Sequence, residues 1–457
     1  MMQTTQILFG TDGVRGPANS GPMAPDCILK LATAAAHHGM KKYFASHGDH
    51  RFTIVIGKDT RLSGYMVESS LVAGFVSMGA DVILLGPLPT PAVAMLTRSL
   101  RAQMGVMISA SHNPFQDNGI KFFGPDGCKI NRSDEETIEQ LTTGKIPLAN
   151  CLKIGRAKRL DDAAGRYIEF AKATFPRGQR LDGLKIVVDC AHGATYKVAP
   201  KVLWELGADV IPVGIEPNGE NINLDCGATS PALLQQTVLS HQADLGIALD
   251  GDGDRLLMVD EHGHILDGDQ LLGLIATLWL EIGLLRGNGI VGTVMSNLGL
   301  ESYLHSKGLT LHRSSVGDRF VLEKMCTEDC NVGGEQSGHI ILKDYVTTGD
   351  GLIAALQVLS LLKNTGQRIS EIAHVFQPVP QILKNIRTTY PINLQSKSIQ
   401  QAISYAEKQL HPHGRLLVRP SGTEPLLRIM AQGNDKPLLD KVIEDLIAAI
   451  QPVEKVA

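Results

Sequence analysis

The sequence predicts an α/β protein: three similar mixed α/β domains followed by a smaller C-terminal α+β domain. Three observations support this. The chain has 457 residues, enough for about three domains at roughly 150 residues each, with two or four also open. A unit of strand, helix, glycine break and strand recurs three times. The last stretch departs from that unit, because two apolar runs flank a polar turn and an amphipathic segment follows.

The recurring unit predicts parallel strands covered by helices. Each copy opens with an apolar run typical of a buried strand, and these runs are residues 53–57, 185–189 and 289–294. A helical pattern follows each run and a glycine ends it, and these glycines are Gly79, Gly207 and Gly308. A second apolar run comes next, so each copy reads as a βαβ unit. We expect four domains, with the bounds 1–160, 161–265, 266–374 and 375–457.

Composition excludes several classes of protein. Lys and Arg total 43 against 47 Asp and Glu, for a net charge of −4, so a broad basic field for nucleic acid is not expected. The N-terminus lacks the pattern of a signal peptide, and the most apolar stretch, residues 271–280, is too short to span a bilayer. Seven scattered cysteines form no CxxC pair, which favours a reduced cytoplasmic protein.

The sharpest motif is DGDGDR at residues 250–255. Asp250, Asp252 and Asp254 fall on one side of an extended loop, where their charges repel unless a cation neutralises them. Oxygen-only ligands favour Mg²⁺ or Ca²⁺. Arg255 stands where a calcium loop of the EF-hand type needs glycine, and the following apolar run reads as a strand. Three carboxylates with free coordination positions suit a metal that also touches a phosphate; a solvated acidic turn is the alternative.

A second motif places a serine between two apolar runs, from Gly105 to Phe123. Ser111 begins the polar turn, His112 follows it, and Lys121 stands at the returning end. A serine hydroxyl on a rigid loop can act as a nucleophile or carry a phosphoryl group. The GxSxG elbow of hydrolases is missing. An ordinary turn would use the same residue types.

Two further loops could bind the ends of a sugar phosphate. The segment 419–425, with Arg428 beyond it, combines backbone N–H groups, hydroxyls and guanidinium forks that suit a phosphate, although a plain hairpin turn would read the same. The segment 333–339 sets short polar side chains and His339 on glycines, which suits sugar hydroxyls and proton transfer. Residues 10–16, 58–61 and 316–319 each join a turn to a base able to hold phosphate.

Taken in order, these segments resemble the α-D-phosphohexomutase superfamily over nearly the whole chain. Four motifs match its phosphoserine, metal, sugar and phosphate loops, and they are ASHNP at 110–114, DGDGDR at 250–255, GEQSGH at 334–339 and PSGTEP at 420–425. GTDGVRG at 10–16, VGDRFV at 316–321 and SGTEP in place of the usual SNTEP are similar to the phosphoglucosamine mutase branch. Two departures are Pro420, where many members carry Lys, and a short insertion at 45–51.

The resemblance implies four domains around a central active-site cleft. It also implies an isomerase that interconverts glucosamine 6-phosphate and glucosamine 1-phosphate, through a phosphoserine and a glucosamine 1,6-bisphosphate intermediate, on the route to UDP-N-acetylglucosamine and peptidoglycan precursors. The rival within the superfamily is a phosphomannomutase or phosphoglucomutase. A hydrolase and a non-catalytic Ca²⁺ or sugar-phosphate binding protein are the rivals from other classes.

Residue roles follow from the same resemblance. Ser111, Lys121, His339 and Arg255 are the catalytic candidates. One Mg²⁺ per chain would be held by Ser111, Asp250, Asp252 and Asp254. The candidates for binding substrate are Arg15, Asp318, Arg319, Glu335, Ser337, Arg419, Ser421, Gly422, Thr423 and Arg428. The expected partner is a small amino-sugar phosphate, with no nucleic acid or membrane, and a homodimer is plausible by resemblance.

Overall fold

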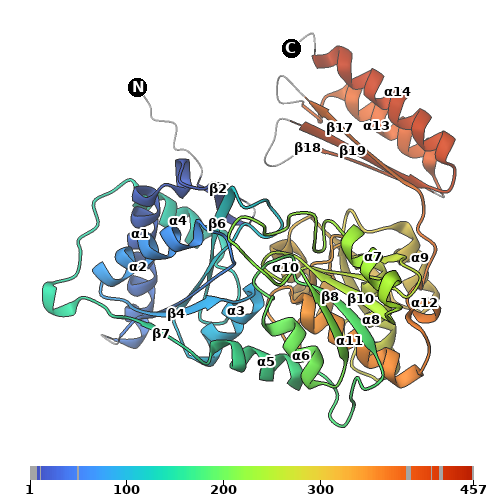
Figure 1. Ribbon diagram of the computed structural model, residues 1–457. Helices are drawn as coiled ribbons and strands as arrows, with labels where there is room; N and C mark the ends of the chain where they lie inside the picture. The colour runs from blue at the N-terminus through green and yellow to red at the C-terminus, as the bar shows by residue number, and fades with distance from the viewer. Residues whose placement is uncertain are drawn as a thin grey trace.

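Four β-sheets organise the part of the chain that the computed structural model describes, which is residues 8–10, 12–48, 51–387, 393–412, 414–420 and 426–454. The first three sheets lie side by side, and the fourth stands apart above them with the end of the chain (Figure 1). The predicted α/β class is confirmed, and so are the parallel strand pairs of all three predicted βαβ units. The expectation of parallel sheets is incomplete, because each of the first three sheets also carries antiparallel strands.

The first sheet has the order β1-β2-β6-β5-β3-β4-β7. Its strands are β1 (Phe9–Gly10), β2 (Gly13–Pro17), β3 (Thr53–Lys58), β4 (Asp81–Pro87), β5 (Met104–Ile108), β6 (Asp117–Phe123) and β7 (Ala157–Arg159). Its helices are α1 (Pro25–His47), α2 (Gly64–Ser77), α3 (Thr90–Ser99) and α4 (Arg132–Thr142). The two apolar runs on either side of Ser111 form the antiparallel pair β5–β6, so Ser111 lies in the connection between two buried strands.

The second sheet has the order β12-β11-β10-β8-β9 and the third β14-β13-β15-β16. The strands of the second sheet are β8 (Lys185–Asp189), β9 (Asp209–Val213), β10 (Leu245–Leu249), β11 (Leu256–Asp260) and β12 (Ile265–Leu266), and its helices are α5 (Ala163–Ala173), α6 (Val198–Glu205) and α7 (Ala232–His241). Those of the third are β13 (Gly289–Thr293), β14 (Thr310–Ser314), β15 (Val332–Gly334) and β16 (Ile340–Leu342). The helices after β12 are α8 (Gly268–Glu281), α9 (Leu298–Ser306), α10 (Asp318–Thr327), α11 (Gly351–Thr365) and α12 (Ile369–Ile372).

The fourth sheet is antiparallel, with the order β17-β19-β18. Its strands are β17 (Gln381–Arg387), β18 (Gly414–Pro420) and β19 (Leu426–Gly433), and its helices are α13 (Lys397–Leu410) and α14 (Lys436–Glu454). Both helices cover the same face of the sheet (Figure 1). This unit is the predicted α+β domain.

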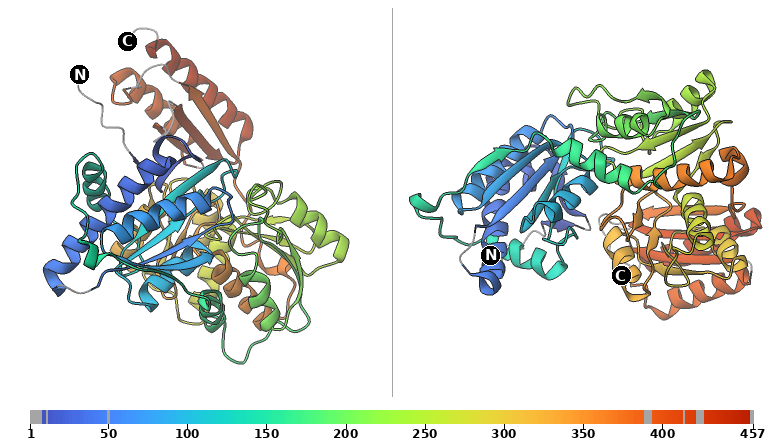
Figure 2. Two further views of the ribbon diagram at one scale, coloured as in Figure 1. Left: turned by 60° about the vertical axis from the view of Figure 1, so that its left-hand side comes forward. Right: turned by 90° about the horizontal axis from the view of Figure 1, so that it is seen from below.

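Packing separates the fourth sheet from the rest. One continuous apolar core runs through the first three sheets, and α11 is buried from Gly351 to Leu362 and contacts strands of both the second and the third sheet. The fourth sheet closes over a core of its own. The view turned about the vertical axis shows the same separation (Figure 2, left). The boundaries predicted at residues 160, 265 and 374 stay predictions, and β12 straddles the second of them.

Candidate active site

The serine loop and the aspartate loop meet at the carboxyl ends of β5 and β10. The hydroxyl Oγ of Ser111 donates a hydrogen bond of 2.6 Å to Oδ2 of Asp250. Both side chains are buried, and 139 residues of chain separate them. The two motifs that the sequence singled out therefore form one site, built from the first and the second sheet.

Ser111 is held in a conformation that serine adopts rarely. Its φ angle is 53°, in the left-handed region, where a residue with a side chain costs about 1–3 kcal/mol unless its surroundings impose the conformation. Here they do. The N–H of Ser111 donates to Oγ of Ser109, and its carbonyl accepts from Nη2 of Arg61 and Nδ2 of Asn223, both at 2.9 Å. These bonds fix the direction of the hydroxyl.

Arg61 is the main support of the serine loop, a role that sequence analysis does not predict. Its guanidinium donates to the carbonyls of Ser111, Asn113, Pro114 and Asp117, and its Nε–H donates to Oδ2 of Asp59. The Arg61 and Asp59 side chains are fully buried. Residues 58–61 were expected to offer a base to phosphate. Arg61 instead uses its donors on the loop itself.

Close packing also fixes the aspartate loop against Ser111. A Cβ atom on Gly251 would lie 2.6 Å from the Ser111 carbonyl oxygen, so only glycine fits there without displacing one loop. Thr90, at the start of α3, donates its hydroxyl to Oδ2 of Asp252 at 2.6 Å. The N–H of Arg255 donates to Oδ1 of Asp250. These contacts hold the carboxylates in place.

The three carboxylates suit a hard cation. One oxygen from each of Asp250, Asp252 and Asp254 lies within 4.8 Å of the others, and all three residues are buried. Oδ1 of Asp252 and Oδ1 of Asp254 are buried without a hydrogen-bond partner among the described residues. Burial, and the charges of Asp254 and Asp252, raise the pKa of Asp250 to about 8. A cation would relieve both the repulsion and the unmet oxygens.

Lys121 lies inside the same site and keeps its charge. Its Nζ is 2.9 Å from Asp252, 3.2 Å from Asp12 and 3.3 Å from Asp254. Burial alone would lower its pKa, but Asp12, Asp252 and Asp254 raise the pKa of Lys121 well above its usual range. The ammonium can therefore stabilise negative charge, and it is a poor general base.

His339 faces the aspartate loop rather than open space. Its Nε2 accepts a hydrogen bond from the N–H of Gly349, and its Nδ1 lies 3.7 Å from Oδ1 of Asp254. Burial would lower the pKa of His339, but Asp254 and Asp318 raise it. Arg255 pairs with His339 through a backbone bridge. Both nitrogens of His339 thus serve contacts within the protein.

A second imidazole lies beside the serine, and sequence analysis assigns it no catalytic role. Nδ1 of His112 is 3.4 Å from the Ser111 hydroxyl. Burial, Arg255 and Arg15 lower the pKa of His112 to about 4, so its ring is neutral at pH 7. Arg15 also pairs with Asp12, which holds it at the same site. Two arginines, Arg15 and Arg255, lie close enough to affect the His112 ring. Their charges distinguish His112 from a histidine in an ordinary turn.

The third sheet contributes the rim of the site. Oε1 of Glu335 accepts from the N–H of Gly317, and Ser337 donates to the other oxygen of Glu335 at 3.3 Å. Asp318 pairs with Lys129, which also pairs with Asp12 and so joins the first and third sheets. Half-buried Glu335 and exposed Ser337 remain within reach of a ligand.

Arg319 is engaged away from this rim. Its guanidinium donates to Glu135 at 2.6 Å and to the carbonyl of Ile130 at 3.1 Å. Glu135 is buried in α4 of the first sheet's unit. The structure therefore gives Arg319 a linking role between the first and third sheets, in place of the free charge that the sequence suggested for substrate.

Two of the predicted phosphate ligands lie on the fourth sheet. Arg419 on β18 and Arg428 on β19 are direct cross-strand partners. Burial and the charge of Arg428 lower the pKa of Arg419, while the charge of Glu335 opposes this effect, so the strand lies within electrostatic reach of the sugar loop. The predicted residues Ser421, Gly422 and Thr423 lie outside the described residues.

Comparison with known proteins identifies the family. Family models of the four phosphoglucomutase/phosphomannomutase domains match residues 6–147 (domain I), 165–263 (domain II), 267–379 (domain III) and 383–449 (C-terminal domain). The chain therefore belongs to the phosphoglucomutase/phosphomannomutase family, which confirms the resemblance read from the four motifs. Family membership, together with the high identity to a phosphoglucosamine mutase described below, shows that the protein is an isomerase that moves a phosphoryl group.

Individual relatives narrow the position within the family. A phosphoglucosamine mutase of Rhodospirillum centenum is 57% identical over 98% of this chain and 95% of its own. A family structure from Burkholderia thailandensis has a TM-score of 0.82 at 22% identity, covering 99% of this chain and 98% of its own. An N-acetylphosphoglucosamine mutase of Aspergillus fumigatus, solved with GlcNAc-6P and magnesium, has a TM-score of 0.65 at 17% identity, covering 97% and 95%. No described helix is long and apolar enough to cross a membrane.

Proposed function

We propose that the protein is a phosphoglucosamine mutase. It would interconvert glucosamine 6-phosphate and glucosamine 1-phosphate through a phosphorylated Ser111 and a glucosamine 1,6-bisphosphate intermediate. The observation that carries the proposal is the 2.6 Å contact between the Ser111 hydroxyl and Asp250, inside a buried cluster of three carboxylates. The identity of 57% to a phosphoglucosamine mutase supports the amino sugar over glucose or mannose.

The cation that we propose is one Mg²⁺, held by Asp250, Asp252, Asp254 and an oxygen of Ser111. Such an ion supplies positive charge beside the phosphoryl group and neutralises charge that develops during transfer. The unmet oxygens of Asp252 and Asp254 support this position. The Aspergillus fumigatus structure, which was solved with magnesium, supports the choice of ion.

Proton transfer would involve groups that the pKa directions separate. Lys121 stays protonated, so we assign it to the stabilisation of negative charge. The neutral imidazole of His112 lies 3.4 Å from the Ser111 hydroxyl, so it would take the hydroxyl proton when the phosphoryl group arrives at Ser111 and return that proton when the phosphoryl group leaves. His339 would act indirectly, because it orients Asp254.

Substrate binding would span the third and fourth units. Glu335 and Ser337 would hold ring hydroxyls, and Arg419 and Arg428 would hold the phosphate that is not being transferred. Arg415 donates to the Val294 carbonyl and Gln432 accepts from the N–H of Leu298 at the start of α9, and these contacts between the third and fourth units support the assignment. Contacts to the distant phosphate would orient the sugar for transfer and exclude water from the phosphoserine.

The unpaired state of the seven cysteines supports the expected cytoplasmic location.

A substrate panel tests the proposal. We expect kcat/KM for glucosamine phosphates to exceed that for glucose and mannose phosphates, without stoichiometric release of inorganic phosphate. A preference for glucose or mannose phosphate would favour the rival mutase. Stoichiometric phosphate release would favour a hydrolase.

A further inference from the structure

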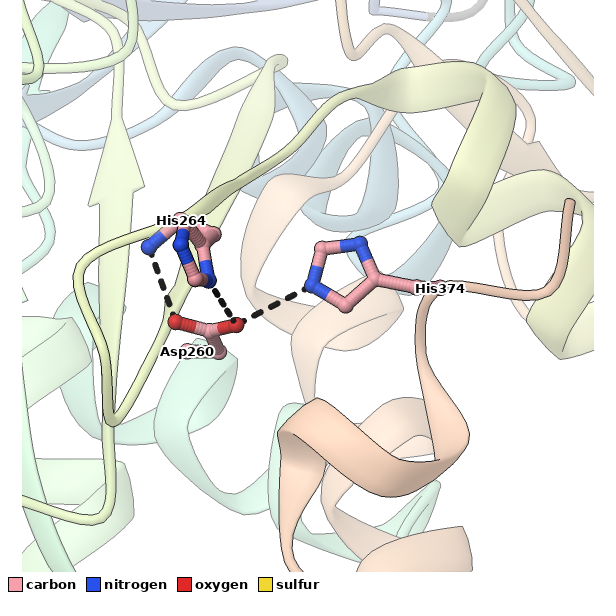
Figure 3. A group of neighbouring side chains, drawn as sticks. All are labelled: Asp260, His264 and His374. Carbon is pink, nitrogen blue, oxygen red and sulfur yellow. Dashed lines mark hydrogen bonds and ion pairs between the residues drawn. The ribbon is translucent and has the colours of Figure 1, made fainter. Parts of the chain in front are cut away.

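A second cluster of metal-binding side chains lies outside the active site. It consists of Asp260 at the end of β11, His264 in the turn before β12, and His374 after α12 (Figure 3). One ligand atom from each lies within 4.8 Å of the other two. Family membership and the reaction assign no role to these residues.

The two imidazoles converge on a single oxygen. Nδ1 of His264 lies 3.1 Å from Oδ2 of Asp260, and Nε2 of His374 lies 3.0 Å from the same atom (Figure 3). Adjacent ligands of a tetrahedral ion with bonds of about 2.0–2.2 Å lie roughly 3.3 Å apart. The observed separations differ from that value by a few tenths of an ångström, so small side-chain shifts would admit an ion.

The carboxylate is fixed in advance, while the imidazoles remain accessible. Asp260 is fully buried, and its Oδ1 accepts from the N–H groups of His262 and His264 at 2.9 Å and 2.8 Å. These bonds leave Oδ2 aimed at the two rings. The His264 side chain is 67% exposed and that of His374 is 34% exposed, so an ion can reach them from solvent and keep water as a further ligand.

A third imidazole borders the cluster. The ring of His264 is 6.0 Å from the ring of His374 on one side and 6.0 Å from the ring of His262 on the other. His262 is exposed and lies near Glu261, which accepts hydrogen bonds from Ser370 in α12. His262 therefore borders the three-residue cluster without being one of its ligands.

We propose that Asp260, His264 and His374 form a binding site for a divalent transition metal of the Zn²⁺ class. Imidazole nitrogens with one carboxylate oxygen suit Zn²⁺, Co²⁺ or Ni²⁺, whereas Mg²⁺ takes oxygen ligands and belongs at the aspartate triplet. The site joins the β11–β12 hairpin to the segment that leads from α12 to β17. A bound ion would tie the second sheet's unit to the connection that carries the fourth.

Zinc titration of the full chain tests this site independently of mutase activity. The titration is done with Mg²⁺ in large excess, so that the aspartate triplet is filled. Wild-type protein should bind one equivalent of Zn²⁺ and gain thermal stability. His264→Gln and His374→Gln can still donate a hydrogen bond to Asp260 but replace the ligand nitrogen, so each should weaken Zn²⁺ binding by at least about 100-fold. His305→Gln, at an exposed histidine in the last turn of α9, is the matched control and should bind as wild type does.

Spectroscopy identifies the atoms that bind the metal. Co²⁺ should give the visible bands of a four- or five-coordinate site with nitrogen ligands, and Zn²⁺ should shift the ring ¹⁵N signals of His264 and His374. Circular dichroism of each metal-free variant establishes that it is folded. If wild type binds no Zn²⁺ under these conditions, or if the two variants bind it as tightly as wild type, the site is overturned and the cluster is a hydrogen-bonded joint between the two segments.

Discussion

Replacing Arg61 by lysine should loosen the serine loop and slow the reaction while leaving substrate affinity nearly unchanged. All five N–H groups of the guanidinium have an acceptor, namely four loop carbonyls and the Asp59 carboxylate. Lysine keeps the charge, but an ammonium has only three N–H groups, so at least two of the five hydrogen bonds are lost. The Arg61→Lys variant isolates the geometry of the support from its charge.

The stability cost follows from those lost bonds. The carbonyls of Ser111, Asn113 and Pro114 each keep a second donor, so the cost is that of lost hydrogen bonds rather than of orphaned acceptors. A hydrogen bond contributes about 0.5–1.5 kcal/mol, so the loss of two should lower the free energy of unfolding by about 1–3 kcal/mol. Arg61→Met should cost more, because it also leaves Asp59 as an uncompensated buried carboxylate, and breaking such a pair costs about 3–5 kcal/mol. Adding Asp59→Asn to Arg61→Met should recover part of that loss.

The kinetic cost follows from the position of Ser111. A displacement of about 1 Å in a reacting group can reduce a rate about 100-fold, so we expect kcat of Arg61→Lys to fall by about that factor. Arg61 contacts none of the residues proposed to bind the distant phosphate, so KM should change little. Urea unfolding and steady-state kinetics measure both effects, with Arg98→Lys, an exposed arginine in the last turn of α3, as control. Wild-type stability and kcat in Arg61→Lys would refute the role assigned to Arg61.

Three further perturbations test the remaining parts of the site. Because the pKa of Asp250 is raised to about 8, metal binding at pH 7 should release a proton. The affinity for the metal should therefore rise from about pH 6 to pH 8 and then level. Calorimetric titration in buffers of different ionisation enthalpy measures the proton release. The same raised pKa stabilises the metal-free fold fully below about pH 4, and this contribution should be lost as pH rises through about 8, so urea unfolding that is flat over this range contradicts the shift. Lys121→Gln should lower kcat at least about 100-fold and tighten metal binding, since its ammonium competes for two of the carboxylates; an unaltered metal affinity argues against that competition. Arg428→Ala should raise KM about tenfold to 100-fold through loss of a charge-assisted phosphate contact, and an unchanged KM removes the anchor.

Local patterns predicted those parts of the fold whose signal is contained within a short segment. The βαβ units could be read from apolar runs and glycine breaks, because a parallel pair needs only a strand, a helix and a second strand. Within the C-terminal unit, the apolar runs of β18 and β19 and the amphipathic helix α14 could be read. The antiparallel strands at the sheet edges could not, since β1, β12 and β16 are two or three residues long and carry no period.

The site divides in the same way. Ser111 and the three aspartates could be found because each motif is compact in sequence. The support by Arg61 could not, because it arises from contacts with carbonyls 50 to 56 residues away, and any residue type has a carbonyl. Arg319 looked like a free base in its turn, and only the folded chain shows that Glu135 neutralises it. The pKa of His112 is lowered by burial and then by Arg255 and Arg15, and these depend on segments that are remote in sequence.

The account depends most on Ser111 as the carrier of the phosphoryl group. Intact-protein mass, followed by peptide mapping, is measured after incubation with glucosamine 1,6-bisphosphate and again after addition of glucosamine 6-phosphate. Wild-type protein should gain the mass of one phosphoryl group on Ser111 and then pass it to the sugar. Ser111→Ala and Ser111→Gly, the second of which suits the left-handed φ angle, should stay folded and gain none. The account would be contradicted by a phosphoryl group on another residue of the wild-type protein, or by phosphorylation of either variant to the same extent as wild type.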